Sequence, residues 1–230
     1  MPNTVIITGA NGNLGTAVVK KFLESGYRVV AIDRANNFLD FAQANPLFEW
    51  HSIDLTDEKA IDTFAQACIG KYGQISAALM LAGGFVMGTI GVTGKDELAR
   101  QYSLNFESAY FLARPLFTHM LEKGYGRLVF IGARPALKPE QGKNTVAYAL
   151  SKSLLFRLAE LMNAEAKNKN VVASVVAPST LDTALNRKSM PDANPEDWVK
   201  PGQVADLLEL ICSEKGMPLR EPVYKVYNNA

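Results

Sequence analysis

The chain has few of the residues that metal centres, thiol chemistry and histidine-based catalysis require. Its 230 residues include only two histidines, His51 and His119, and two cysteines, Cys68 and Cys212. A Ser-His-Asp triad or a zinc site is therefore poorly supplied, and we expect no metal. The cysteines lie far apart in the sequence and form no CxxC pattern, so buried free thiols are expected in place of a disulfide.

The sequence also lacks a strong charge and a long apolar run. Its formal net charge is +1, which gives no electrostatic reason to expect binding to nucleic acid or to an anionic membrane. No apolar run reaches the length of about 18 residues that a membrane helix needs. The N-terminus shows no charged region followed by an apolar one, as a signal peptide would. We expect a cytoplasmic protein without nucleic-acid or membrane partners.

Short apolar segments rich in β-branched residues alternate with longer segments of helical spacing. Hydrophobic residues make up 48% of the chain, enough for a large core. The alternation predicts one α/β domain over residues 1–230, a doubly wound parallel sheet of Rossmann type. The expected strands are 4–8, 28–33, 48–53, 75–81, 127–131, 171–177 and 223–226. The expected helices are 14–24, 58–71, 95–123, 148–167 and a segment around 204–212.

A glycine-rich turn follows the first expected strand and opens the first expected helix. It reads Gly-Ala-Asn-Gly-Asn-Leu-Gly over residues 9–15. Glycines at such a turn let the backbone approach a pyrophosphate, which then rests on the helix N-terminus. The sequence therefore predicts a dinucleotide site. The residues of the turn expected to bind the cofactor are Gly9, Asn11, Gly12, Asn13, Leu14 and Gly15.

Charged residues at two strand ends bear on the choice of cofactor. Asp33 ends the second expected strand, where a carboxylate accepts hydrogen bonds from ribose hydroxyls and repels a 2′-phosphate. This favours NADH, whereas Arg34 beside it can pair with that phosphate, so NADPH is kept as an alternative. Asp54, at the end of the third strand, is either an acceptor for the adenine amino group or a helix N-terminal cap.

A tyrosine and a lysine, Tyr148 and Lys152, stand at a spacing that places them on one side of a helix. A nearby ammonium favours the phenolate and should lower the tyrosine pKa from its usual value of about 10. Such a pair can supply a proton, although the spacing alone also occurs on exposed helices. After the fourth strand, Ala82, Gly83 and Gly84 suit close backbone approach to the cofactor, or form a plain turn.

Together these motifs resemble those of the short-chain dehydrogenase/reductase family over essentially the whole chain. The glycine turn has the spacing GxxGxxG where most of the family has GxxxGxG, and Leu81 replaces the asparagine of the family's NAG-type motif. The resemblance implies that Tyr148 donates a proton, while Lys152 holds the nicotinamide ribose and lowers the tyrosine pKa. It also implies that Asn105 fixes a water in the proton relay.

The resemblance extends to the end of the sixth strand and to assembly. It implies that Pro178, Thr180 and Thr183 lie at the cofactor, with the threonine hydroxyls near the nicotinamide carboxamide. It also implies a homodimer or homotetramer formed through the helices 95–123 and 148–167. The apolar residues of the first helix suit either that interface or the core; they are Tyr110, Phe111, Leu112, Leu116 and Phe117.

The family's catalytic serine is missing. The family motif before the tyrosine ends in Ser-Ser, whereas residues 126–133 read Gly-Arg-Leu-Val-Phe-Ile-Gly-Ala and place Ala133 at the serine position. Alanine cannot hydrogen-bond a substrate carbonyl, and losing such a donor costs an ordinary carbonyl reductase about 3 kcal/mol in its barrier. Thr145 and Ser179 are candidates to replace the hydroxyl, on position alone.

One branch of the family, the quinonoid dihydropteridine reductases, resembles this chain at residues 131–137 and 178–191. A quinonoid ring is already electron-poor, so it accepts hydride with less help from a hydroxyl. We therefore expect an NAD(P)H-dependent oxidoreductase that reduces a small molecule, a quinonoid pterin or a related activated substrate, under a covering loop at 178–201. The alternatives are a generic carbonyl or quinone reductase and a dinucleotide-binding protein without catalysis.

Overall fold

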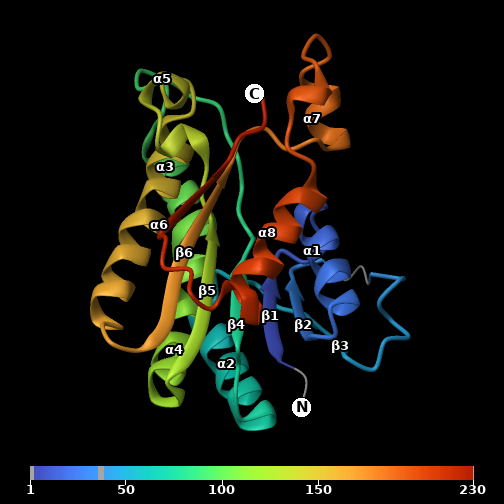
Figure 1. The fold of residues 1–230 in the computed structure, drawn as a ribbon. Coiled ribbons are helices and arrows are strands. Elements are labelled where there is room, and N and C mark those ends of the chain that lie inside the picture. The colour runs from blue at the N-terminus through green and yellow to red at the C-terminus, as the bar shows by residue number, and fades with distance from the viewer. Residues whose placement is uncertain (1–2, 36–38, 230) are drawn as a thin grey trace.

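A parallel β-sheet with helices on both faces forms the body of the molecule (Figure 1). The computed structural model describes residues 3–35 and 39–229. Within them the sheet has seven strands in the order β3-β2-β1-β4-β5-β6-β7, and neighbouring strands all pair in parallel. This confirms the predicted α/β, Rossmann-type fold.

The strands and helices follow the predicted alternation closely. The strands are β1 Thr4–Thr8, β2 Arg28–Asp33, β3 Phe48–Ser52, β4 Ala77–Met80, β5 Tyr125–Ile131, β6 Asn170–Pro178 and β7 Val223–Val226. The helices are α1 Asn13–Glu24, α2 Glu58–Tyr72, α3 Lys95–Tyr102, α4 Ser108–Lys123, α5 Pro139–Gly142, α6 Val146–Glu165, α7 Ala184–Ser189 and α8 Pro201–Cys212. None of the helices in these described stretches combines the length and the apolar character of a membrane span.

Two apolar layers hold the sheet between its helices. The central strands are buried on both faces, which explains their nearly continuous runs of Val, Ile and Ala. On one face α1 and α8 lie side by side and contribute Val18, Phe22 and Leu208. On the other face α2, α4 and α6 pack through residues such as Phe64 and Leu116. Cys68 and Cys212 are buried free thiols, as expected.

The predicted helix 95–123 is interrupted in its middle. α3 ends at Tyr102, a single π-helical turn occupies Ser103–Glu107, and α4 begins at Ser108. A π turn adds a residue to the helical repeat and often marks a functional site. Here it carries Asn105, which the next section places in a buried hydrogen-bond network.

The segment 178–201 is more regular than its composition predicts. It holds the short helix α7 and a 3₁₀ turn at Pro195–Asp197. The α7 helix begins at a capping threonine, because Thr183 Oγ1 accepts a hydrogen bond from Asn186 N at 3.1 Å. Figure 1 shows α7 beyond the carboxyl ends of the strands, where the predicted site lies.

Candidate active site

The glycine turn after β1 makes contacts that only glycine allows. Gly9 has a left-handed φ of +64°, and a Cβ there would lie 2.9 Å from Ala82 Cα. A Cβ on Gly15 would lie 2.1 Å from Gly9 O, so α1 packs directly on the turn. Gly12 is the N-cap of α1 and offers no side-chain cap. The backbone N–H groups of the first helical turn are therefore left for a ligand, as a dinucleotide site requires.

A threonine that the sequence analysis did not select joins this turn to the loop after β4. Thr8 is 1% exposed, and its Oγ1 accepts hydrogen bonds from Leu81 N at 3.1 Å and from Ala82 N at 3.2 Å. A single hydroxyl at the end of an apolar strand, immediately before the glycines, is the signal that points to it. Of the other three predicted turn residues, Asn13 and Leu14 begin α1, and the Leu14 side chain is buried in the core.

A cavity of about 290 Å³ opens at the carboxyl ends of the central strands. The predicted cofactor residues that line it are Gly9, Gly12, Asp33, Arg34, Asp54, Ala82 and Gly83. Asp33 is held in place because its Oδ2 accepts from Asn11 N at 3.0 Å and its Oδ1 accepts from Ala35 N at 3.1 Å. The structure thus brings the turn and the Asp33 carboxylate together around one space.

Asp54 does not cap α2, so that alternative is wrong. The cap is Asp57, whose side chain accepts from Ala60 N at 3.0 Å. Asp54 Oδ1 instead accepts from the backbone N–H and the hydroxyl of Thr56, at 2.9 and 2.7 Å. The hydrogen bond from the Thr56 backbone N–H, and after it the one from the Thr56 hydroxyl, hold the pKa of Asp54 below its usual value. An ionised acceptor therefore faces the cavity.

Tyr148 and Lys152 lie on α6, and both are perturbed by burial. Lys152 is 4% exposed and its Nζ donates to Ile131 O at 2.7 Å. Burial lowers the pKa of Lys152 to about 8 and raises the pKa of Tyr148 to about 12. The change at Tyr148 is opposite to the predicted lowering, because desolvation of the phenol outweighs any help from the lysine. A phenol with that pKa remains protonated at neutral pH.

The Tyr148 ring also has an aromatic neighbour from the loop after β4. Phe85 packs against it edge-on, with ring centroids 5.0 Å apart and an interplanar angle of 73°. Phe85 is nevertheless 62% exposed, so most of its ring surface remains open to a ligand beside the phenol. Phe85 is not predictable from the sequence, because nothing in its spacing connects it with Tyr148.

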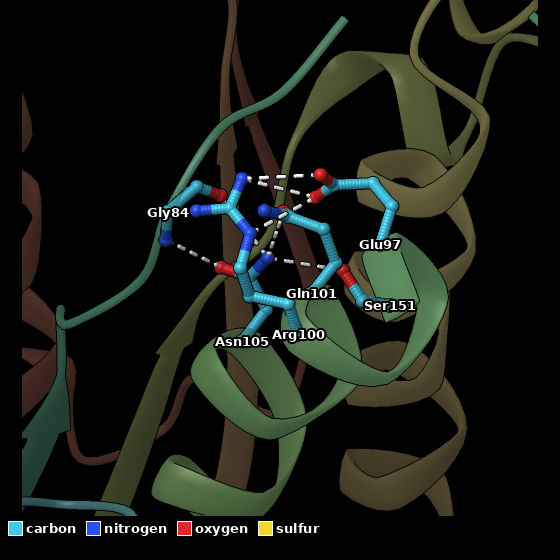
Figure 2. A network of polar contacts seen from close by, with 6 residues as sticks. All are labelled: Gly84, Glu97, Arg100, Gln101, Asn105 and Ser151. Atoms are coloured by element: carbon cyan, nitrogen blue, oxygen red, sulfur yellow. Dashed lines mark hydrogen bonds and ion pairs between the residues drawn. The ribbon is translucent and has the colours of Figure 1, made fainter. Parts of the chain in front are cut away.

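Asn105 is the centre of a polar network under the loop after β4 (Figure 2). Its Oδ1 accepts from Gly84 N at 2.9 Å, and its Nδ2 donates to Gly84 O, Gln101 Oε1 and Ser151 Oγ at 3.1, 2.9 and 3.0 Å. Three protein acceptors thus share its two amide hydrogens. Both amide hydrogens of Asn105 are therefore engaged within the protein, and the side chain clamps Gly84; the relay water that the resemblance implies stays a prediction.

The clamp brings three predicted residues into contact. A Cβ on Gly83 would lie 2.5 Å from Asn105 Oδ1 and 3.1 Å from Lys152 Nζ. Gly83 is therefore needed for the close packing of Asn105 and Lys152 against the loop, and the approach of this backbone to the cofactor stays a prediction. Ser151 links the clamp to the tyrosine, because its Oγ also donates to Tyr148 O at 2.9 Å. Gln101 is fully buried and was not predicted; its only signal in the sequence is the spacing of four residues that separates its amide from that of Asn105.

Both predicted substitutes for the hydroxyl that Ala133 lacks already make a hydrogen bond to a backbone carbonyl. Ala133 follows β5 and is 5% exposed. Ser179 Oγ donates to Tyr227 O at 2.7 Å, and Thr145 Oγ1 donates to Gly142 O at 3.4 Å. Each hydroxyl hydrogen is directed to a backbone carbonyl.

The predicted cofactor residues after β6 lie at the base of the segment 178–201. Pro178 is the last residue of β6, and Thr180 O accepts from Val199 N at 2.9 Å. The Thr183 hydroxyl caps α7, so its oxygen is already an acceptor. Within the segment, Arg187 forms a two-pronged ion pair with Asp182, at 2.6 and 2.9 Å.

Comparison with known proteins places this geometry in a family. A model of the short chain dehydrogenases matches residues 3–194. The chain belongs to the short-chain dehydrogenase/reductase family. It is thus an oxidoreductase of the NAD(P)-dependent kind.

Relatives of this short-chain dehydrogenase/reductase are distant. A dihydropteridine reductase of Dictyostelium discoideum is 28% identical over 218 residues, which cover 90% of this chain and 87% of the relative. An uncharacterized oxidoreductase of Schizosaccharomyces pombe is 26% identical over 201 residues, and the chain covers 65% of its length. A solved 4-hydroxyisoleucine dehydrogenase complexed with NADH has a TM-score of 0.88 at 20% identity, covering 98% of this chain and 97% of that one.

The residues of this family member fit a nicotinamide dinucleotide. A Cβ at Gly9 or Gly15 would collide with neighbouring backbone, α1 begins without a side-chain cap, and Asp33 faces the same cavity. The Lys152 ammonium lies close to Gly83, which is one of the residues that line that cavity. A reduced nicotinamide bound there supplies a hydride, while the protein supplies orientation and a proton.

Proposed function

We propose that this protein is an NADH-preferring reductase of the dihydropteridine reductase type. It reduces a quinonoid pterin or a related electron-poor ring. The observation that carries the proposal is Ala133 at the serine position, with the hydroxyls of Thr145 and Ser179 both donating elsewhere. A ketone needs a donor at its oxygen, whereas a quinonoid ring regains a stabler ring system on accepting hydride. The similarity to the Dictyostelium enzyme supports the same assignment.

In this proposal Tyr148 protonates the substrate as the hydride arrives. Burial keeps the pKa of Tyr148 near 12, so the proton is present throughout the neutral range. The Lys152 ammonium, next to Gly83, holds the nicotinamide ribose and stabilises the phenolate that forms. The open ring of Phe85 gives a flat apolar wall beside the donor, which suits a planar ring. The segment 178–201 covers the substrate from the α7 side.

The substrate assignment is tested by turnover. The purified protein should oxidise NADH with quinonoid dihydropterin well above background, and simple ketones should be reduced at least about 100-fold more slowly. Introducing a hydroxyl with Ala133→Ser should raise ketone reduction about tenfold or more, while pterin reduction stays within about threefold. A wild-type protein that reduces ketones as fast as the pterin would be the generic carbonyl reductase instead.

The preference for NADH rests on Asp33. Its fixed carboxylate can accept from both ribose hydroxyls, and it repels a 2′-phosphate. We expect NADH to bind about tenfold more tightly than NADPH, with the ratio measured by cofactor fluorescence. Asp33→Asn keeps the size of the side chain and one acceptor oxygen but removes the charge. The two cofactor affinities should therefore become more similar, mainly because NADPH binds more tightly. Equal affinities of the wild type for NADH and NADPH would show that Arg34 offsets the effect of Asp33 on the cofactor preference.

We further propose a homodimer or homotetramer formed through α3 and α6. Three of the residues predicted for this face, Leu112, Leu116 and Phe117, are buried in the core. An apolar groove of about 640 Å³ between α3 and α6 takes their place; it is lined by Leu98, Tyr102, Leu150 and Leu154, with others. Each of these four side chains is partly exposed. Sedimentation of the purified protein tests the interface. The wild type should sediment as a dimer or tetramer, and Leu150→Glu, which places a charge in the groove, should sediment as a smaller species.

A further inference from the structure

The segment 178–201 leaves the sheet and returns to it at one place. Leu181 and Val199 form an isolated parallel bridge. Asp182 N donates to Val199 O at 2.8 Å, and Val199 N donates to Thr180 O at 2.9 Å. Trp198 and Val199 are buried, so this return leg is packed against the body of the protein. Between the two legs the chain forms α7 and the 3₁₀ turn at Pro195–Asp197.

A residue from the far end of the chain contacts the return leg. Asn228 follows β7, and its Nδ2 donates to Glu196 O at 3.2 Å and to Trp198 O at 3.1 Å. One amide thus binds two carbonyls of the same short stretch, just before the bridge. Asn228 has a left-handed φ of +51°, a conformation that asparagine tolerates better than most residues. The local backbone is therefore shaped to direct this amide at the leg.

Asn228 is itself fixed to the strand ends that border the active site. The residue before it, Tyr227, accepts from Ser179 Oγ through its carbonyl at 2.7 Å, and Ser179 N donates to Val226 O at 2.9 Å. The Arg134 guanidinium lies over the Tyr227 ring at 5.3 Å. Arg134 directly follows Ala133, so the Asn228 amide is connected to the end of β6 and to the residue next to the missing serine.

We propose that Asn228 is a positioning residue for the substrate. It holds the return leg of the segment 178–201 at a fixed place relative to β5 and β6, and through that leg it sets where α7 lies over the site. Asn228 does not touch the substrate in this role. The inference rests on the proposed function of the segment as the substrate cover.

The experiment compares Asn228→Gly with Asn168→Gly. Glycine removes the amide and adopts a left-handed φ without strain, so the hydrogen bonds alone are lost. Asn168 is the matched control, because it has a φ of +69° and lies before the amino end of β6, away from the segment. Asn228→Gly should raise KM for quinonoid dihydropterin about threefold or more, with kcat and the NADH Kd within about twofold of wild type.

A second readout needs no substrate. Arg187 and Lys188 on α7 are trypsin sites inside the segment, and Asn228→Gly should speed cleavage there about threefold or more. Unchanged cleavage together with an unchanged KM would overturn the inference. Faster cleavage with an unchanged KM would also overturn it, because Asn228 would then anchor the leg without positioning the substrate. A wild type with no pterin turnover refutes the proposed function alone, and the cleavage rate then still decides whether Asn228 anchors the segment.

Discussion

Replacement of Tyr148 by phenylalanine is expected to lower kcat by about a thousandfold, with the NADH Kd within about twofold of wild type. The phenol of Tyr148 is the proposed proton donor, and the Lys152 ammonium is held in place by its hydrogen bond to Ile131 O. Burial raises the Tyr148 pKa to about 12, so the phenol is the stable form and its proton is released only as the substrate gains negative charge. Phenylalanine keeps the ring and removes only the hydroxyl that carries this proton.

The measurement is single-turnover NADH oxidation with quinonoid dihydropterin, with Tyr102→Phe as control. Tyr102 is a partly exposed tyrosine on α3, in the groove toward α6, where its ring packs against Phe106. The edge-on contact with Phe85 involves the ring and should survive in Tyr148→Phe, so the melting temperature should change little. A rate that falls less than about tenfold would mean that the proton comes from water and that Tyr148 only shapes the site.

The sequence predicts the sheet well because its signal is local. β1, β2 and β7 begin and end as predicted, since each strand is a short apolar run with turn residues or charges at its ends. The glycine turn can also be predicted from the sequence, because the collisions that exclude a Cβ at Gly15 come from residues a few positions away. Such features need no knowledge of distant segments.

The features that the sequence does not predict depend on distant contacts. The π turn carries Asn105 to Gly84 and to Ser151, residues 21 and 46 positions away. The direction of the Tyr148 pKa shift follows from burial under the rest of the protein, which helical spacing to Lys152 cannot show. Asn228 contacts a leg about 30 positions earlier, and nothing in its local sequence indicates that partner.

Lys152→Met should weaken catalysis and stabilise the fold at the same time. Burial lowers the Lys152 pKa from 10.5 to about 8, which corresponds to a cost of roughly 3 kcal/mol for the buried ammonium in the protein without cofactor. Methionine removes that cost but leaves Ile131 O without its donor, and this loss reduces the gain in the free energy of unfolding by about 1 kcal/mol. We expect the free energy of unfolding at pH 7 to rise by about 1–2 kcal/mol, while NADH binds about tenfold more weakly and kcat falls about 100-fold.

The pH dependence separates this explanation from simple repacking. The folded pKa of Lys152 lies below the unfolded one, so the unfolded chain binds more protons between pH 8 and 10.5. The contribution of Lys152 to wild-type stability therefore improves as the pH rises through that window, and it is most unfavourable below pH 8. Denaturant unfolding of both proteins at pH 7 and pH 10 should show their difference shrinking at the higher pH. A constant difference between the two proteins would show that the gain in stability comes from packing and not from removal of the buried ammonium.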